Sequence, residues 1–120
     1  MTTSAILAAR ESIEMKRGDK TVFVFTIRDS AGDPYDMSAY TKINMAAKSS
    51  PDMAEACFVL TLQDGISLTP PNVLTVTVEH THTVNLACGS YHYDIQCSDD
   101  AGKVDTVIEG TLLLDQDITR

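Results

Sequence analysis

The fold is decided by the stretch Gly89-Ser-Tyr-His-Tyr-Asp-Ile-Gln-Cys-Ser-Asp-Asp-Ala-Gly-Lys-Val-Asp-Thr-Val-Ile-Glu-Gly-Thr111, which has the pattern of one β-hairpin. In its first half, one face carries Tyr91, Tyr93, Ile95 and Cys97, and the other carries His92, Asp94, Gln96 and Ser98. A period of two is typical of a strand with one buried face. The tetrapeptide Asp99-Asp100-Ala101-Gly102 predicts the turn, because Gly102 can adopt a positive φ. Val104, Thr106 and Ile108 are expected to resume the alternation on the return strand.

Runs of β-branched and aromatic residues, separated by turn residues, predict further strands on both sides of the hairpin. These strands cover residues 11–16, 21–28, 41–48, 56–62, 66–68, 73–79 and 110–117, the last either continuing the hairpin through a glycine bulge or separate from it. Both faces of residues 21–28 are expected to be covered, as in a central strand. Leu74, Val76 and Val78 are expected to point inward, and residues 80–86 form a crossover with room for a helical turn.

About seven to nine short strands, with turn signals every eight to twelve residues or so, favour an antiparallel two-sheet β-sandwich over an α/β fold. A closed or partly open barrel is the alternative. With 120 residues, the chain is expected to form one domain, residues 1–120. Residues 1–10 are poorly patterned, and we expect them to form an arm that is flexible or ordered by a partner.

Composition excludes several function classes. The net charge of −8 disfavours nucleic acid and anionic membrane surfaces as partners, because both require Lys and Arg. No apolar run is long enough for a membrane helix or a signal peptide, so we expect the chain to be made and kept in the cytosol. The three cysteines include no close pair and indicate neither a disulfide framework nor a zinc site. Cys57 and Cys97 are interpreted as buried structural thiols.

Two groups of side chains are candidates for chemistry. His80 and His82 form a His-x-His pair on one side of a strand, with His92 as a third potential metal ligand. The carboxylates of the hairpin could bind calcium or do acid–base work; they are Asp94, Asp99, Asp100, Asp105 and Glu109. Neither group has the spacing of a known site, and a charged outer sheet face and a polar turn account for the carboxylates. The sequence therefore predicts a protein that is not an enzyme, with no catalytic, cofactor-binding or metal-binding residues and no cofactor.

A series of short motifs gives the chain a family resemblance. In order, they are Gly18-Asp19, Asp29-x-x-Gly32-x-Pro34-x-Asp36-Met37-Ser38-x-Tyr40-Thr41, Gly89-x-Tyr91-x-Tyr93-Asp94-Ile95-Gln96, Asp100-Ala-Gly102-Lys-Val104-x-Thr106, Gly110 and Asp117-Ile118-Thr119-Arg120. This order resembles the immunoglobulin-like domains of tailed-bacteriophage virion proteins. Similar domains include the N-terminal part of upper baseplate proteins and small tail or head accessory proteins. The resemblance covers the chain from about residue 15 to residue 120.

The resemblance implies an Ig-like β-sandwich that assembles into a phage or prophage virion through protein–protein contacts. The expected partners are other virion proteins, and a homo-oligomer is the expected state. The chain ends at Thr119-Arg120 with no fibre-forming extension, so we expect a stand-alone assembly component rather than a receptor-binding one. The runner-up is a carbohydrate- or surface-binding β-sandwich module, disfavoured because the chain has no Trp and few outward aromatics. A third hypothesis is a small metal-dependent enzyme, which would have to hold its metal with His80 and His82.

Overall fold

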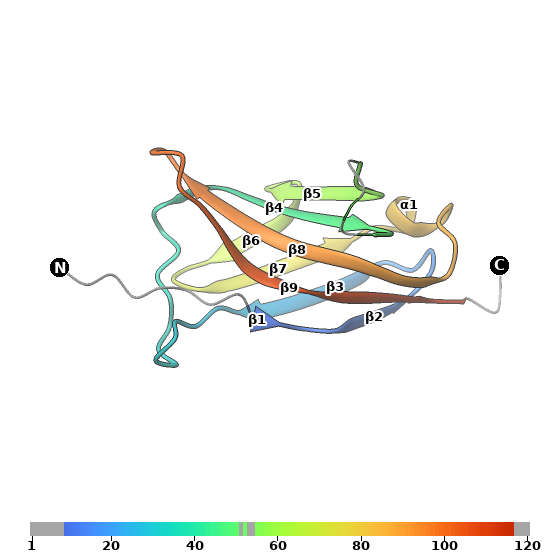
Figure 1. Ribbon diagram of the computed structural model, residues 1–120, viewed down its shortest axis with the longest axis horizontal. Coiled ribbons are helices and arrows are strands. Elements are labelled where there is room, and N and C mark those ends of the chain that lie inside the picture. Colours follow the sequence, from blue (N-terminus) through green and yellow to red (C-terminus); the bar gives the residue numbers. More distant parts are fainter. Residues whose placement is uncertain (1–8, 51, 53–54, 117–120) are drawn as a thin grey trace.

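The computed structural model describes residues 9–50, 52 and 55–116, and over these residues the chain forms strands and one short helix (Figure 1). The elements are β1 (Ala9–Arg10), β2 (Ile13–Lys16), β3 (Thr21–Thr26), β4 (Tyr40–Lys48), β5 (Phe58–Leu62), β6 (Gly65–Thr69), β7 (Val73–Val78), α1 (His80–Thr83), β8 (Gly89–Asp99) and β9 (Val104–Asp115). Each predicted strand overlaps an observed one, and the helical turn of the crossover is α1. Of the predicted arm, Ala9–Arg10 form β1, and residues 1–8 lie outside the described residues.

The strands form one curled, mixed sheet. Their hydrogen-bonded order is β1-β9-β8-β4-β5-β6-β7-β3, and β2 also pairs with β9. The sheet curls so that β3, β6 and β7 lie behind β8 and β9 in Figure 1. The all-β class is confirmed, whereas the expectation of two purely antiparallel sheets is wrong. Both β1 and β2 run parallel to β9, and β5 runs parallel to β6. Alternation of side chains fixes which face of a strand is buried, but it carries no information on strand direction.

The core fills the space that the curled sheet encloses. The predicted inward row of β8 is confirmed, since Tyr91, Tyr93, Ile95 and Cys97 are all buried. The inward row of β7 is confirmed as well: Leu74, Val76 and Val78 are fully buried. The central-strand interpretation of residues 21–28 is wrong. There Phe25 and Ile27 are buried, but Val22 and Val24 lie on the solvent-facing side and are 52% and 63% exposed, and β3 is the last strand of the sheet rather than a central one.

A β-bulge in β9 shifts the phase of the return strand. The pairing of β8 with β9 changes register between Ile95 and Gln96, so that Ile95 faces Ile108 and Gln96 faces Thr106. The residue left between them is Val107, which is buried together with Ile108. Two consecutive inward residues are what a bulge produces. Val104 and Thr106 therefore share the outward face of Ser98 and Gln96, contrary to the predicted alternation. β9 continues through Gly110 without a second shift, so the bulge lies three residues before the predicted glycine.

Gly110 is needed because the backbone of Glu11 crosses directly over it. A Cβ atom placed on Gly110 would lie 2.0 Å from the carbonyl oxygen of Glu11. That oxygen accepts a 2.6 Å hydrogen bond from the hydroxyl of Tyr93, whose Cα partner on β9 is Gly110. Burial raises the pKa of Tyr93, which keeps its hydroxyl protonated as a donor. Tyr93 and Gly110 thus fix the place where the chain passes from β1 to β2.

Replacing Gly110 with Ala is expected to destabilise the protein by about 3 kcal/mol, because the added methyl group must displace the Glu11 backbone. Gly32→Ala is the control. Gly32 has a φ of +88° with open space around it, so its substitution costs only the left-handed backbone strain, about 1 kcal/mol. Urea denaturation of both variants measures the difference. Equal losses would contradict the role assigned to the close crossing.

Candidate functional site

The outer face of the β3–β7–β6 part of the sheet carries no charged side chain within its strands. Across the strands, Val22 faces Thr77, Val24 faces Thr75, and Thr26 faces Val73. The same face continues onto β6 through Ser67 and Thr69. We define the neutral face as these outward residues: Val22, Val24, Thr26, Ser67, Thr69, Val73, Thr75 and Thr77. Such a surface is unusual on a chain of which 22% is charged.

The neutral face ends at an open strand edge. Ile27 donates its N–H to the carbonyl of Asn72 at 2.9 Å, in continuous antiparallel register with β3 and β7. Hydrogen-bonded and non-hydrogen-bonded residue pairs alternate in such a ladder. Because Ile27 is in a hydrogen-bonded pair, the other odd-numbered residues of β3 also form their backbone hydrogen bonds with β7. The backbone N–H and C=O groups of Val22, Val24 and Thr26 therefore point away from β7. Within the described part of the chain, no strand pairs with the edge of β3 that faces away from β7.

The opposite end of the sheet is protected in ways that β3 lacks. There the edge consists of β1 and β2, two short strands interrupted at Glu11-Ser12. This edge also carries two ion pairs, in which Arg10 lies 3.4 Å from Glu109 and Lys16 lies 2.9 Å from Asp115. Short strands and charged side chains are devices that prevent edge-to-edge pairing. In contrast, the six residues of β3 contain no charge, proline or glycine.

A polar groove of about 490 Å³ lies on the other outer face, over β4, β8 and β9. Its lining includes Arg10, Lys48, His92, Asp94, Gln96 and Glu109. Asp94 and Glu109 are Cα partners across the two strands, which places two carboxylates side by side. Burial raises the pKa of Asp94, and Glu109 adds to the increase while Lys48 opposes it. The groove therefore combines both signs of charge with an amide, Gln96, that donates to Asp94 at 3.4 Å.

The five candidate carboxylates do not converge. Asp94 and Glu109 line the groove, whereas Asp99 accepts the N–H groups of Ala101 and Lys103 at 3.0 Å each and so forms the hairpin turn. Asp100 is exposed at the same turn. Among the residues that the structure describes, no group of three or more His, Cys, Asp or Glu side chains could hold a metal ion.

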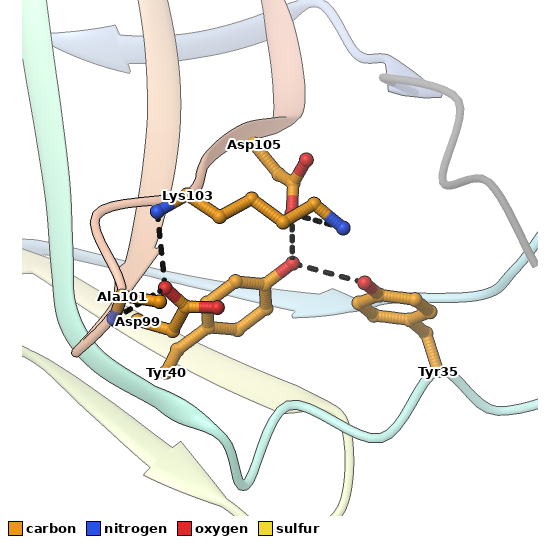
Figure 2. A network of polar contacts seen from close by, with 6 residues as sticks. All are labelled: Tyr35, Tyr40, Asp99, Ala101, Lys103 and Asp105. Atoms are coloured by element: carbon orange, nitrogen blue, oxygen red, sulfur yellow. Dashed lines mark hydrogen bonds and ion pairs between the residues drawn. The ribbon is translucent and has the colours of Figure 1, made fainter. Parts of the chain in front are cut away.

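Asp105 is placed differently from the prediction, which put it on the outer face or in the turn. Because of the bulge it pairs with the inward Cys97, and its carboxylate accepts a 2.6 Å hydrogen bond from the Tyr40 hydroxyl. Figure 2 shows the network, in which the Tyr35 and Tyr40 hydroxyls are 2.9 Å apart and Lys103 lies 3.7 Å from Asp105. Burial and the bond to Asp105 raise the pKa of Tyr40. The adjacent apolar pair Val107-Ile108 was the signal in the sequence for this phase change.

The three histidines do not form a site. His80 and His82 lie on α1 rather than on a strand, and residues two apart on a helix do not share a face. His80 Nδ1 contacts the Gly18 carbonyl oxygen at 2.6 Å, which ties α1 to the turn before β3. His82 Nδ1 accepts the Glu79 N–H at 2.9 Å, and its ring stacks on Phe58 with centroids 5.5 Å apart. His92 lies apart from them, in the groove.

The thiols differ in burial. Cys97 is fully buried, as predicted, and burial raises its pKa to about 12. Cys57 is only half-buried, which corrects the prediction of a buried thiol, and Cys88 is exposed. A fully buried thiol with a raised pKa is chemically inert, so Cys97 serves the core.

Comparisons with known proteins bear on the fold. No protein-family model matches the chain, and no curated protein matches its sequence. The structure is similar to that of the fibronectin(III)-like modules of Clostridium thermocellum CbhA, with a TM-score of 0.49 and 9% sequence identity. This similarity covers 92% of the present chain and 94% of the other. Over the described residues, no helix has the length and apolarity needed to cross a membrane.

Asp94→Asn is expected to raise the melting temperature at pH 7 by about 1–3 °C. The folded protein raises the Asp94 pKa, so stability falls as pH rises through the unfolded and then the folded pKa, and the neutral amide avoids that loss. At about pH 3, where the carboxyl group is protonated, the gain should vanish. Thermal denaturation at both pH values tests this, with Asp100→Asn at the exposed turn as the control. An equal gain at both pH values would refute the electrostatic explanation.

Proposed function

We propose that the chain is a non-enzymatic structural component of a phage or prophage virion, either in the tail or baseplate or as a head accessory protein. It acts through protein–protein contacts with other virion proteins. The observation that carries the proposal is the open, uncharged edge of β3 with its exposed Val22 and Val24. The order of turn and hairpin motifs from Gly18 to Gly110, which resembles virion immunoglobulin-like domains, supports the assignment to a virion.

An open strand edge is a hazard to a protein, because other chains can pair with it. Thr21-Val-Phe-Val-Phe-Thr26 combines high β-propensity with no charge, proline or glycine, which is the signature of a segment that pairs with other chains. A protein that keeps such an edge exposed risks aggregation unless a partner covers it. Strand addition at this edge would supply main-chain hydrogen bonds for affinity. The outward valines and threonines would supply the side-chain contacts.

The remaining polar side chains support a role in contacts rather than chemistry. His80 and His82 bind the backbone around α1, and Asp99 builds the hairpin turn. Asp105 binds Tyr40 at the margin of the core. These groups hold the ends of the strands together, as expected of a rigid module that acts through assembly contacts.

The virion assignment is tested in particles produced by the strain that carries the gene. We expect the chain in purified, density-banded particles at a fixed ratio to the major structural proteins, measured by quantitative mass spectrometry. Val24→Lys places a charge at the open edge and should reduce incorporation at least about tenfold, because a lysine on an edge strand opposes edge-to-edge pairing.

Val59→Lys is the matched control for this test. Val59 lies on β5 and is 53% exposed, close to the 52% of Val22, but it is away from the β3 edge. This variant should be incorporated normally. Particles that lack the wild-type chain would overturn the proposed function.

A carbohydrate- or surface-binding module is the second candidate, and the groove over β4, β8 and β9 is the observation in its favour. Asp94, Gln96 and Arg10 are groups that can bind sugar hydroxyls. Of Phe, Tyr and Trp, the groove lining contains only Tyr93, which is 3% exposed and offers no ring face for stacking. The groove therefore supports this function less well than the β3 edge supports assembly.

A glycan panel decides between the two candidates. We expect no glycan to bind with a dissociation constant below about 1 mM. Binding of a defined sugar that is lost in Asp94→Ala, but kept in Asp64→Ala away from the groove, would establish the binding module instead.

A further inference from the structure

We propose that β3 pairs antiparallel with β3 of a second copy of this chain across a twofold axis. The two β6-β7-β3 regions would then form one continuous sheet. This inference rests on the proposed function, for which it names the first partner. It draws on the direction of the open backbone groups, the charges along the edge, and the burial of Phe23.

The open edge is suited to pairing with itself. Val22, Val24 and Thr26 direct their N–H and C=O groups outward, as the antiparallel ladder with β7 requires. A twofold axis brings the same patch of both copies together, so one edge must complement itself. An antiparallel arrangement satisfies this condition, because donors and acceptors alternate identically in both directions.

The charges at the ends of the strand select the register. With the axis at Phe23, Val22 of each copy faces Val24 of the other, and Lys20 faces Thr26. With the axis at Val24, Lys20 would instead face Arg28 of the second copy, and directly opposed like charges are destabilising. In the Phe23 register, Lys20 keeps its ion pair with Glu79 at 3.7 Å, and Arg28 keeps its bond to the Gly32 carbonyl at 3.2 Å.

The Phe23 register also completes the burial of an aromatic side chain. Phe23 points to the core side of β3 but is only half-buried, unlike Phe25, whose ring centroid is 6.5 Å away. A non-hydrogen-bonded pair on the axis brings the two Phe23 Cα atoms to about 4.5 Å. Each Phe23 ring would then cover the exposed part of the other.

The net charge of the chain favours this surface over the rest. Two copies of net charge −8 repel each other, and the repulsion is strongest where acidic groups meet. The neutral face brings none of its own charges to the contact. The groove face, in contrast, would bring the Asp94–Glu109 pair of one copy toward that of the other.

Sedimentation velocity of the full chain over a range of concentrations tests the pairing. We expect a reversible monomer–dimer equilibrium, and Val24→Lys should weaken the dimer at least about tenfold. Val59→Lys should leave the equilibrium unchanged. A chain that stays monomeric up to about 1 mM, or a dimer insensitive to Val24→Lys, would overturn the proposal.

A cysteine placed on the axis tests the register. In a Cys88→Ser background, Phe23→Cys should form an intermolecular disulfide readily, since a Cα separation of about 4.5 Å lies within disulfide range. Thr21→Cys, which would lie opposite residue 25 of the second copy, should link far more slowly. Faster linkage at Thr21 would refute the register.

The particle experiment separates this inference from the function on which it rests. A strictly monomeric chain that is still incorporated into particles would refute the β3–β3 pairing alone. A chain that dimerises through β3 but is absent from particles would refute the virion assignment alone.

Discussion

The pairing of β8 with β9 is the constraint on which the rest of the structure depends. Its register sets Tyr93 opposite Gly110, and this glycine leaves room for the Glu11 backbone to cross over β9. The Tyr93 hydroxyl then holds that crossing, so that β1 and β2 can add in parallel to the same strand. The bulge at Val107 in the same pair turns Asp105 inward to meet Tyr40. One hairpin thus determines one edge of the sheet and the polar margin of the core.

The two edges of the sheet differ in a way that bears on function. On the β9 side, short strands and ion pairs protect the edge. On the β3 side, the edge is regular and uncharged, and it adjoins a face of valine, threonine and serine. The groove over β4, β8 and β9 is instead lined by charged residues of both signs, namely Arg10, Lys48, Asp94 and Glu109. This asymmetry favours contact through one end of the sheet and solvation of the other.

Several of the polar groups that first suggested chemistry have structural partners. His80 and His82 are bonded to backbone atoms near α1, Asp99 closes a turn, and Asp105 accepts the Tyr40 hydroxyl. Together with His92, Asp94 and Glu109 line the groove, where these two carboxylates are neighbours on adjacent strands. Their proximity follows from register, which the spacing of residues along the chain does not reveal.

The sequence by itself determined the strands and most of their buried faces, because alternation of apolar residues follows directly from the pleat. It therefore identified the inward rows of β7 and β8 and the turn at Asp99–Gly102. Strand order, strand direction and the bulge depend on contacts between residues far apart in the chain, and only the tertiary structure decided them. For that reason the sequence predicted a central strand at residues 21–28. Val22 and Val24 are of a residue type that is usually buried, and only the tertiary structure shows that they lie on the solvent-exposed outer face of the last strand.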